Sequence, residues 1–193
     1  MEPIVLAANS TALVLIDLQR GIMGRDTAPR PTAMVLANAV RLADRFRQLA
    51  AMVVLVRVSF SADGKDVLAA PVDSPFTVRP GQMPANWAEI SPELGPREGD
   101  LVITKHQWGA FYGTELDLQL RRRGVRSIVL GGIATNFGVE STARDAWERN
   151  YALIFAEDAM AAMSADAHAF AVGNIFPRLG RIRSTDIILK ALE

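Results

Sequence analysis

Residues 127–146 read SIVLGGIATNFGVESTARDA, and this stretch decides the fold. Ser127–Leu130 is a short, mostly apolar run, long enough for a buried strand and too short for a helix. Gly131 and Gly132 are expected to end that strand. From Gly138 onward, the side chains that recur at helical spacing are Val139, Thr142, Ala143, Ala146 and Trp147. The stretch therefore predicts a strand, a glycine-rich turn and a helix.

The turn itself, residues 133–136, has the character of an anion site. A strand, a tight turn and a helix N-terminus bring several backbone N–H groups to one point, and the helix dipole favours negative charge there. The same groups could hold a developing oxyanion. An ordinary strand-to-helix crossover is the alternative that the turn alone leaves open.

Composition limits the class of protein. The 193 residues suit one domain, residues 1–193, with a sizeable core. Acidic and basic residues balance at 21 each, so we expect no nucleic-acid partner. No apolar run approaches a membrane span, and the N-terminus lacks the pattern of a signal peptide, so we expect no membrane association. The absence of cysteine excludes a thiolate nucleophile and is compatible with the expected cytoplasmic location.

Further apolar runs alternate with helical patterns along the chain. Strands are expected at Thr11–Ile16, Met52–Val58, Leu101–Thr104, Ala152–Phe155 and Arg181–Arg183. Helices are expected to begin at Thr32, as a possible N-cap, and at Thr114, where Asp117 would complete a capping-box-like start. A further helix is expected from Ser164 toward Asn174, with Pro177 just beyond it, and a last one over Ser184–Leu192. This alternation, with strand sequences typical of burial on both faces, predicts one doubly wound α/β domain around a parallel sheet.

A long irregular region, Ser59–Gly99, interrupts this pattern and holds six of the ten prolines. Loops of this length inside a compact domain are usually functional. We expect a lid or an interface segment here, with Trp87 as one of its contact residues.

Two charged residues end predicted strands in the way that a ligand site requires. Asp17 follows the first strand and Lys105 the third, while the glycine-rich turn follows the fourth. In doubly wound sheets, the ligand crevice lies at the carboxyl ends of the strands. A carboxylate beside an ammonium there makes a general acid/base pair, because each controls the protonation of the other. A capping aspartate and a solvated lysine are the alternatives for each residue alone.

Three segments, in order and at strand ends, resemble the signature segments of the isochorismatase-like (cysteine hydrolase) family. They are IDLQ around Asp17, TKHQWGAFYGTEL from Thr104 to Leu116, and GGIATNFGVESTARDAW from Gly131 to Trp147. The likeness continues through AEDAMAAMSADAH, residues 156–168. It is strongest to bacterial isochorismatase-family hydrolases of unassigned substrate.

The resemblance implies a three-layer α/β/α, Rossmann-like fold with a mainly parallel six-stranded sheet. Members with an Asp–Lys–Cys triad place the aspartate at Asp17 and the lysine at Lys105, but the cysteine position falls on Gly138. The resemblance also implies a non-proline cis peptide joining Ile133 to Ala134. That bond would aim backbone N–H groups, those of Ala134 and Gly138, into the pocket.

A glycine at the nucleophile position excludes a covalent thioester mechanism. True isochorismatases similarly replace the cysteine by glycine and cleave a vinyl ether by acid/base chemistry. By this analogy Asp17 is the proton donor, Lys105 orients it or binds a substrate carboxylate, and Gly138 contributes its N–H. The other substrate-binding candidates are Gln19, Gln107, Trp108, Phe111, Ile133, Ala134, Asn136 and Phe137.

Two further interpretations stay open, namely water activated directly by Asp17, and a non-catalytic member that binds a small acid or serves as an oligomeric scaffold. We expect no cofactor and no metal, because the stretch after the second strand, residues 56–64, has no histidine. His106 beside Lys105 could line the site, whereas His168 lies on a helix and is expected to be structural. Partners are expected to be a small carboxylate substrate and further copies of the chain, as a homodimer or homotetramer.

Overall fold

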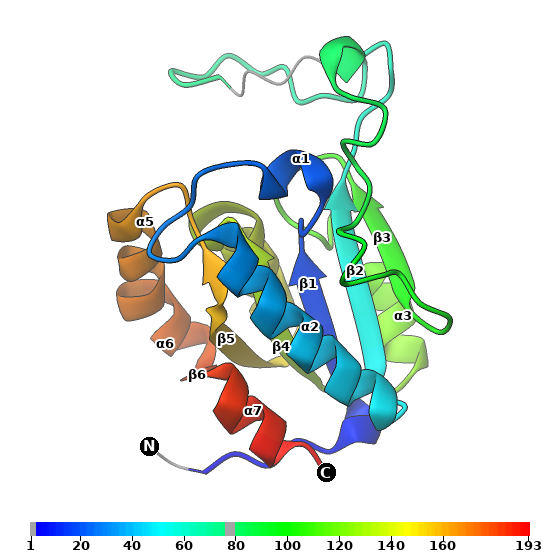
Figure 1. Ribbon diagram of the computed structural model, residues 1–193, viewed down its shortest axis with the longest axis vertical. Helices are drawn as coiled ribbons and strands as arrows, with labels where there is room; N and C mark the ends of the chain where they lie inside the picture. The colour runs from blue at the N-terminus through cyan, green and yellow to red at the C-terminus, as the bar shows by residue number, and fades with distance from the viewer. Residues whose placement is uncertain (1–2, 76–79) are drawn as a thin grey trace.

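The fold is a six-stranded sheet covered by helices on both faces (Figure 1). A computed structural model describes residues 3–75 and 80–193. The strands are β1 Thr11–Ile16, β2 Met52–Val58, β3 Leu101–Lys105, β4 Ser127–Ile133, β5 Ala152–Ala161 and β6 Gly180–Arg183. All pair in parallel, in the order β3-β2-β1-β4-β5-β6. The predicted α/β architecture is confirmed.

Helices and helical turns connect the strands. The α-helices are α1 Arg20–Met23, α2 Thr32–Gln48, α3 Leu116–Arg122, α4 Glu140–Glu148, α5 Ala165–Phe170, α6 Phe176–Leu179 and α7 Thr185–Ala191. The 3-10 turns are η1 Ala8–Ser10 and η2 Pro80–Gln82, and two π-helical turns are η3 Thr135–Val139 and η4 Ala171–Ile175. Among the described residues, no helix is long and apolar enough to span a membrane.

Alternation along the strands explains the three layers. In β1, Leu13 and Leu15 belong to the core cluster under α2 and α7, whereas Val14 and Ile16 belong to the opposite cluster under α3, α4 and α6. Because side chains alternate across a strand, an uninterrupted apolar run covers both faces of a parallel sheet. This is why the predicted strand at residues 11–16 carries no polar alternation.

Four strands are longer than predicted, β3 and β6 by one residue each and β4 and β5 by several. β4 continues through the glycines to Ile133. Gly132 pairs with Ile16 of β1 so closely that an added Cβ would come within 2.1 Å of the Ile16 carbonyl oxygen, so only glycine fits there. β5 continues to Ala161 across Glu157 and Asp158. Both acidic side chains are engaged, Asp158 with the backbone N–H and hydroxyl of Thr185 at 2.7 Å each.

Several predicted helix ends are wrong in detail. Pro31, not Thr32, precedes α2, and no side chain caps it. Asp117 does not cap α3, because its carboxylate accepts a 2.8 Å hydrogen bond from the Tyr151 hydroxyl. Pro177 lies in the first turn of α6 rather than beyond a helix, a position that a proline tolerates. Ser164 caps α5 as predicted, accepting from the Ala167 N–H at 3.4 Å.

The region between β2 and β3 forms an arm that projects from the body beyond the carboxyl ends of β1 and β2 (Figure 1). Residues 76–79 within it lie outside the described part. Trp87 is not an outer contact residue: it is 8% exposed and packs in the core under α2. A Cβ on Gly21 would come within 2.1 Å of its ring, so Trp87 holds α1 to the end of the arm.

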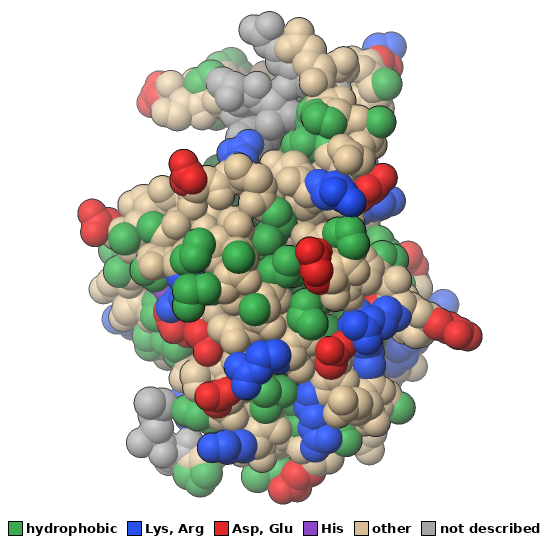
Figure 2. Space-filling model, in the orientation of Figure 1, with side chains coloured by type: hydrophobic (Ala, Val, Ile, Leu, Met, Phe, Trp, Pro, Cys, Tyr) green, Lys and Arg blue, Asp and Glu red, His purple; other side chains and the backbone are tan. Residues whose placement is uncertain are grey.

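The surface carries charges of both signs. On the face shown in Figure 2, the Lys and Arg side chains are interspersed with Asp and Glu, and the arm stands apart from the body. This distribution agrees with the balanced charge of the sequence.

Candidate active site

The site lies where the strand order reverses. β1 and β4 are neighbours, and the chain leaves them in opposite directions along the sheet, toward β2 and toward β5. Doubly wound sheets bind ligands at this switch point, outside the carboxyl ends of the strands. Asp17 follows β1 directly, and η3 follows β4 after a single residue.

Lys105 reaches Asp17 across an intervening strand. It ends β3, two strands away from β1, so its long side chain must span about 10 Å of sheet together with the aspartate. Its Nζ donates to Asp17 Oδ2 at 2.8 Å and to the Gln107 carbonyl oxygen at 3.0 Å. The lysine side chain is 1% exposed and the aspartate side chain 9%, so the pair is desolvated.

Burial dominates the protonation of Asp17. It raises the pKa of the carboxyl above its ordinary value, and the Coulomb attraction and hydrogen bond of the Lys105 ammonium oppose this rise without cancelling it. The second oxygen, Oδ1, is buried with no hydrogen-bond partner among the described residues. Asp17 also has a φ of 55°, a left-handed conformation of the kind that collects at functional sites.

Gly138 completes the cluster. A Cβ placed on this residue would lie 3.2 Å from Asp17 Oδ2, 3.6 Å from Lys105 Nζ and 2.9 Å from Ile16 Cγ2. The backbone of Gly138 thus lies directly against the ion pair, at the position where a side chain would be crowded. The peptide bond between Ile133 and Ala134, at the start of the same turn, is cis.

Two aromatic residues lie together on the surface beside these segments. The rings of Trp108 and Phe137 have centroids 4.7 Å apart, and the two residues are 57% and 41% exposed. Trp108 belongs to the loop after β3 and Phe137 to η3. The contact therefore joins the loop that follows Lys105 to the turn that holds Gly138.

The other residues of the turn divide between buried and partly buried positions. Ile133 is 1% exposed and belongs to the core cluster under α2, and Ala134 packs against that cluster. The side-chain oxygen of Asn136 is buried without a partner among the described residues, as Asp17 Oδ1 is. The turn thus adds a second unpaired acceptor to the site region.

Two of the substrate-binding candidates, Gln19 and Phe111, have buried side chains that contact other parts of the protein. Gln19 is fully buried; its Nε2 donates to the carbonyl oxygens of Val58 and Trp87, at 3.0 and 3.2 Å, and its Oε1 accepts from the Val58 N–H at 2.8 Å. Phe111 is 4% exposed and packs in the core under α3. We assign both residues to support of the site rather than to contact with a ligand.

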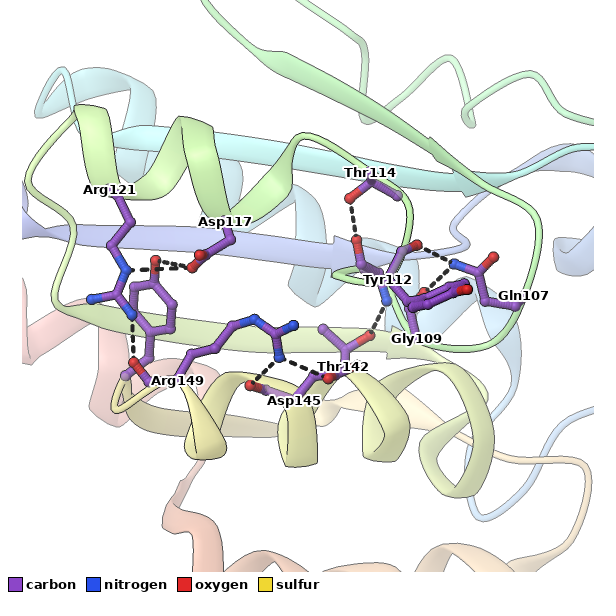
Figure 3. A network of polar contacts seen from close by, with 11 residues as sticks. Gln107, Gly109, Tyr112, Thr114, Asp117, Arg121, Thr142, Asp145 and Arg149 are labelled. Carbon is purple, nitrogen blue, oxygen red and sulfur yellow. Dashed lines mark hydrogen bonds and ion pairs between the residues drawn. The ribbon is translucent and has the colours of Figure 1, made fainter.

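The loop after β3 is held by a polar network (Figure 3). Gln107 Nε2 donates to the carbonyl oxygens of Gly109 and Tyr112, at 2.9 and 2.8 Å. On α4, the Thr142 hydroxyl accepts from the Ala110 N–H at 3.1 Å and donates to the Gly138 carbonyl oxygen at 2.6 Å. Thr142, which sequence reasoning did not select, ties the loop to the turn.

The two histidines lie in different environments. His106 contacts the base of the arm, with Nδ1 2.6 Å from the Ser59 carbonyl oxygen and 3.3 Å from Asp66 Oδ2. His168 is buried and contacts Thr135 in the turn, a pairing that no local sequence pattern signals. Within residues 3–75 and 80–193, no group of three His, Cys, Asp or Glu side chains is placed to hold a metal ion.

The sequence is similar to those of known proteins over most of its length. Residues 11–187 match the model of the isochorismatase domain. The chain is 49% identical over 187 residues to the uncharacterized isochorismatase family protein YecD of Escherichia coli O157:H7, covering 97% of this chain and 98% of that one. It is 33% identical over 181 residues to the ureidoacrylate amidohydrolase RutB of Variovorax paradoxus, covering 82% and 71%.

A solved structure agrees with the fold in detail. The isochorismatase family protein from Burkholderia thailandensis superposes with a TM-score of 0.92 at 43% identity, covering 98% of this chain and 97% of that one. The matched segment runs from β1 into α7 and so includes Asp17, Lys105 and Gly138. The chain belongs to the isochorismatase family of hydrolases.

Proposed function

We propose that the protein hydrolyses a small anionic metabolite by acid/base chemistry between Asp17 and Lys105, without a covalent enzyme intermediate. The observation that carries this proposal is the buried 2.8 Å contact of Lys105 Nζ with Asp17 Oδ2, placed directly against a glycine. A cysteine-dependent relative would use a thiolate at that position, whereas this chain contains no cysteine. Acid/base catalysis remains the chemistry for which the residues are present.

Vinyl-ether hydrolysis of the isochorismate type fits these groups. Asp17 transfers a proton to the terminal carbon of the enol ether, and the ether oxygen stabilises the resulting oxocarbenium ion. Water adds to that ion, and the hemiketal collapses to a ketone and an alcohol. The returned proton restores Asp17, so the net reaction consumes one water molecule and needs no nucleophilic side chain.

The surroundings of Asp17 support the role of acid. A raised pKa keeps part of the carboxyl protonated nearer neutrality, as general acid catalysis requires. With Oδ2 accepting from Lys105, the unpartnered Oδ1 is the oxygen that can carry the transferable proton. Lys105 holds the carboxyl in place and offers positive charge to a substrate carboxylate.

Binding of the anion is assigned to the turn and its neighbours. The N–H groups of Ala134 and Gly138 are proposed to hold the substrate carboxylate or the developing charge. The half-exposed Trp108 and Phe137 form an apolar edge for the rest of the ligand, and Gln107 keeps the loop in place. The unpaired Asn136 oxygen suits a hydroxyl or amide donor on the substrate.

Amide hydrolysis by water that ionised Asp17 activates is the second candidate reaction. The relative at 33% identity is an amidohydrolase, which favours this possibility. A binding protein or scaffold without catalysis is the third candidate. Assays with enol ethers, beginning with isochorismate, and with ureido and carbamoyl amides distinguish them: product from enol ethers supports the proposal, product only from amides replaces it, and binding without product indicates a non-catalytic protein.

We further propose that the chain assembles as a homodimer or homotetramer through the projecting arm. Leu68 and Val72 lie on the arm and are 77% and 61% exposed. An arm of this kind gains burial for its apolar side chains by packing against a second copy.

A further inference from the structure

We infer that His168 is a positioning residue for the proposed site, acting through the Thr135 hydroxyl to hold the turn that carries Gly138. The inference rests on the proposed function for its kinetic consequence, but the geometry of the turn can be tested without turnover. It assigns a role to a row of hydrogen-bonded side chains that takes no part in the acid/base pair, namely Arg30, Glu157, His168 and Thr135.

This row of side chains runs from the surface of the molecule to the turn. Arg30 Nη2 contacts Glu157 Oε1 at 2.8 Å, and the same oxygen lies 2.9 Å from His168 Nε2. On the other side of the ring, Nδ1 lies 2.8 Å from Thr135 Oγ1. His168 is 4% exposed and Thr135 is fully buried, so water does not screen this contact.

Arg30, at the surface end of this row of side chains, is held in place by hydrogen bonds to the backbone. Arg30 Nη1 donates to the carbonyl oxygens of Glu157 and Met160, at 2.9 and 2.8 Å. The backbone just before Arg30 pairs with the residue that follows β5: Ala28 and Ala162 exchange two N–H···O bonds of 2.8 and 2.9 Å. The histidine therefore contacts a carboxylate that is itself fixed in position.

The Glu157 carboxylate determines which ring nitrogen of His168 carries a hydrogen. The hydrogen bond from His168 lowers the pKa of Glu157 to about 2, with Arg30 contributing and burial opposing. An ionised carboxylate only accepts, so His168 Nε2 carries a hydrogen. In the neutral ring, Nδ1 then accepts from the Thr135 hydroxyl; in the cationic ring, Nδ1 donates and the hydroxyl hydrogen must turn elsewhere.

Thr135 transmits this constraint to the site. It is the first residue of η3, follows the residue that ends the cis peptide, and precedes Gly138 by three positions. The Gly138 backbone lies against Asp17 and Lys105, so a change in the turn alters the space around the pair. A shift of about 1 Å in a group near the reacting atoms can lower a rate by about 100-fold.

The first test compares Thr135→Val, which keeps the shape and removes the hydroxyl, with Thr135→Ser, which keeps the hydroxyl. Labelling with 15N-glycine gives 14 expected backbone amide signals, of which Gly138 reports the turn. We expect Thr135→Val and His168→Gln to shift the Gly138 signal strongly, while Thr135→Ser leaves it near the wild-type position. Gly99 and Gly124, on loops at the amino ends of β3 and β4 and so at the opposite edge of the sheet, serve as internal controls and should not move.

The kinetic test uses whichever substrate the enol-ether and amide assays identify. We expect Thr135→Val to lower kcat by about 10- to 100-fold at nearly unchanged KM, and Thr135→Ser to restore it. An unmoved Gly138 signal in Thr135→Val, accompanied only by a lower melting temperature, overturns the inference and leaves a purely structural contact. A shifted Gly138 signal in an enzyme with no turnover overturns the proposed function and retains the positioning role.

Discussion

Lys105 Nζ donates a 2.8 Å hydrogen bond to Asp17 Oδ2 inside the protein, while Asp17 Oδ1 is buried without a partner among the described residues. One oxygen of the carboxyl is thus held by an ammonium and the other is free for a ligand. This asymmetry separates the two tasks of the carboxyl: attachment to the scaffold and exchange of a proton.

Loss of Lys105 should destabilise the protein mainly through the carboxyl it leaves behind. Removing one partner of a buried ion pair costs about 3–5 kcal/mol, so we expect Lys105→Met to lower the free energy of unfolding by an amount in that range. Without the lysine, Asp17 stays protonated in the folded protein but ionises above about pH 4 when unfolded. The loss should therefore grow as pH rises from 5 to 8.

Urea unfolding of the single and double variants measures this coupling. The double variant Asp17→Asn/Lys105→Met should recover much of the stability that Lys105→Met loses, because an asparagine side chain takes up no proton when it is buried. Equal losses in Lys105→Met and in the double variant, independent of pH, would show that the lost packing of the lysine stem is the cause.

Gly132 should tolerate no side chain. Its φ is 119°, and an added Cβ would lie 2.1 Å from the Ile16 carbonyl oxygen, a backbone atom that cannot move away alone. We expect Gly132→Ala to cost about 3 kcal/mol or more, from overpacking and the unfavourable φ together. Gly124→Ala is the matched control, since Gly124 has a φ of 69° and nothing within 4 Å of its added Cβ; it should cost about 1–2 kcal/mol. Equal losses in urea unfolding would rule out the close approach of β1 and β4 as the cause.

Glu157 should stabilise the protein less in acid. Its pKa is about 2 in the folded protein and 4.5 ordinarily, so its contribution is complete above pH 4.5 and declines as pH falls toward 2. Wild type should therefore exceed Glu157→Gln in free energy of unfolding at pH 7, and the difference should shrink at pH 3.5. A difference that is the same at both values would mean that the ionised carboxylate is not the stabilising form.

The arm should determine the oligomeric state. We expect light scattering to give the mass of a dimer or tetramer for the wild-type chain, and a smaller mass for Leu68→Asp/Val72→Asp. Because both side chains are exposed in the single chain, the variant should still fold, and its far-UV circular dichroism should match that of wild type. A monomeric wild type would exclude the proposed assembly.

Much of the fold follows from local patterns. The strands at residues 11–16 and 52–58 begin and end as predicted, because a largely apolar run that ends at a polar residue is typical of a buried parallel strand. The extension of β5 across Glu157 and Asp158 could not be predicted in this way. Its acidic side chains are satisfied by Arg30, His168 and Thr185, which are distant in the sequence.

The candidate site, too, could be predicted from local sequence only in part. The placement of Asp17, Lys105 and the turn at strand ends was enough to predict that they meet, since the carboxyl ends of parallel strands lie at one edge. The uses of Gln19 and Phe111 depend on the arm and on α3, whose docking no periodicity reveals. Trp147 is 53% exposed although its spacing predicts burial, because it lies at the edge of the buried face of α4, one residue before the helix ends.

The central claim is that Asp17 donates a proton to the substrate and that no acyl-enzyme forms. Its most direct test is the pH profile of kcat/KM for hydrolysis of isochorismate and related enol ethers by wild type, Asp17→Asn and the exposed-loop control Asp26→Asn. We expect a wild-type rate that falls as pH rises above the raised pKa of Asp17, a loss of about 100- to 10,000-fold in Asp17→Asn, and an unchanged rate in Asp26→Asn. Enol-ether turnover that Asp17→Asn retains at the wild-type rate would contradict it.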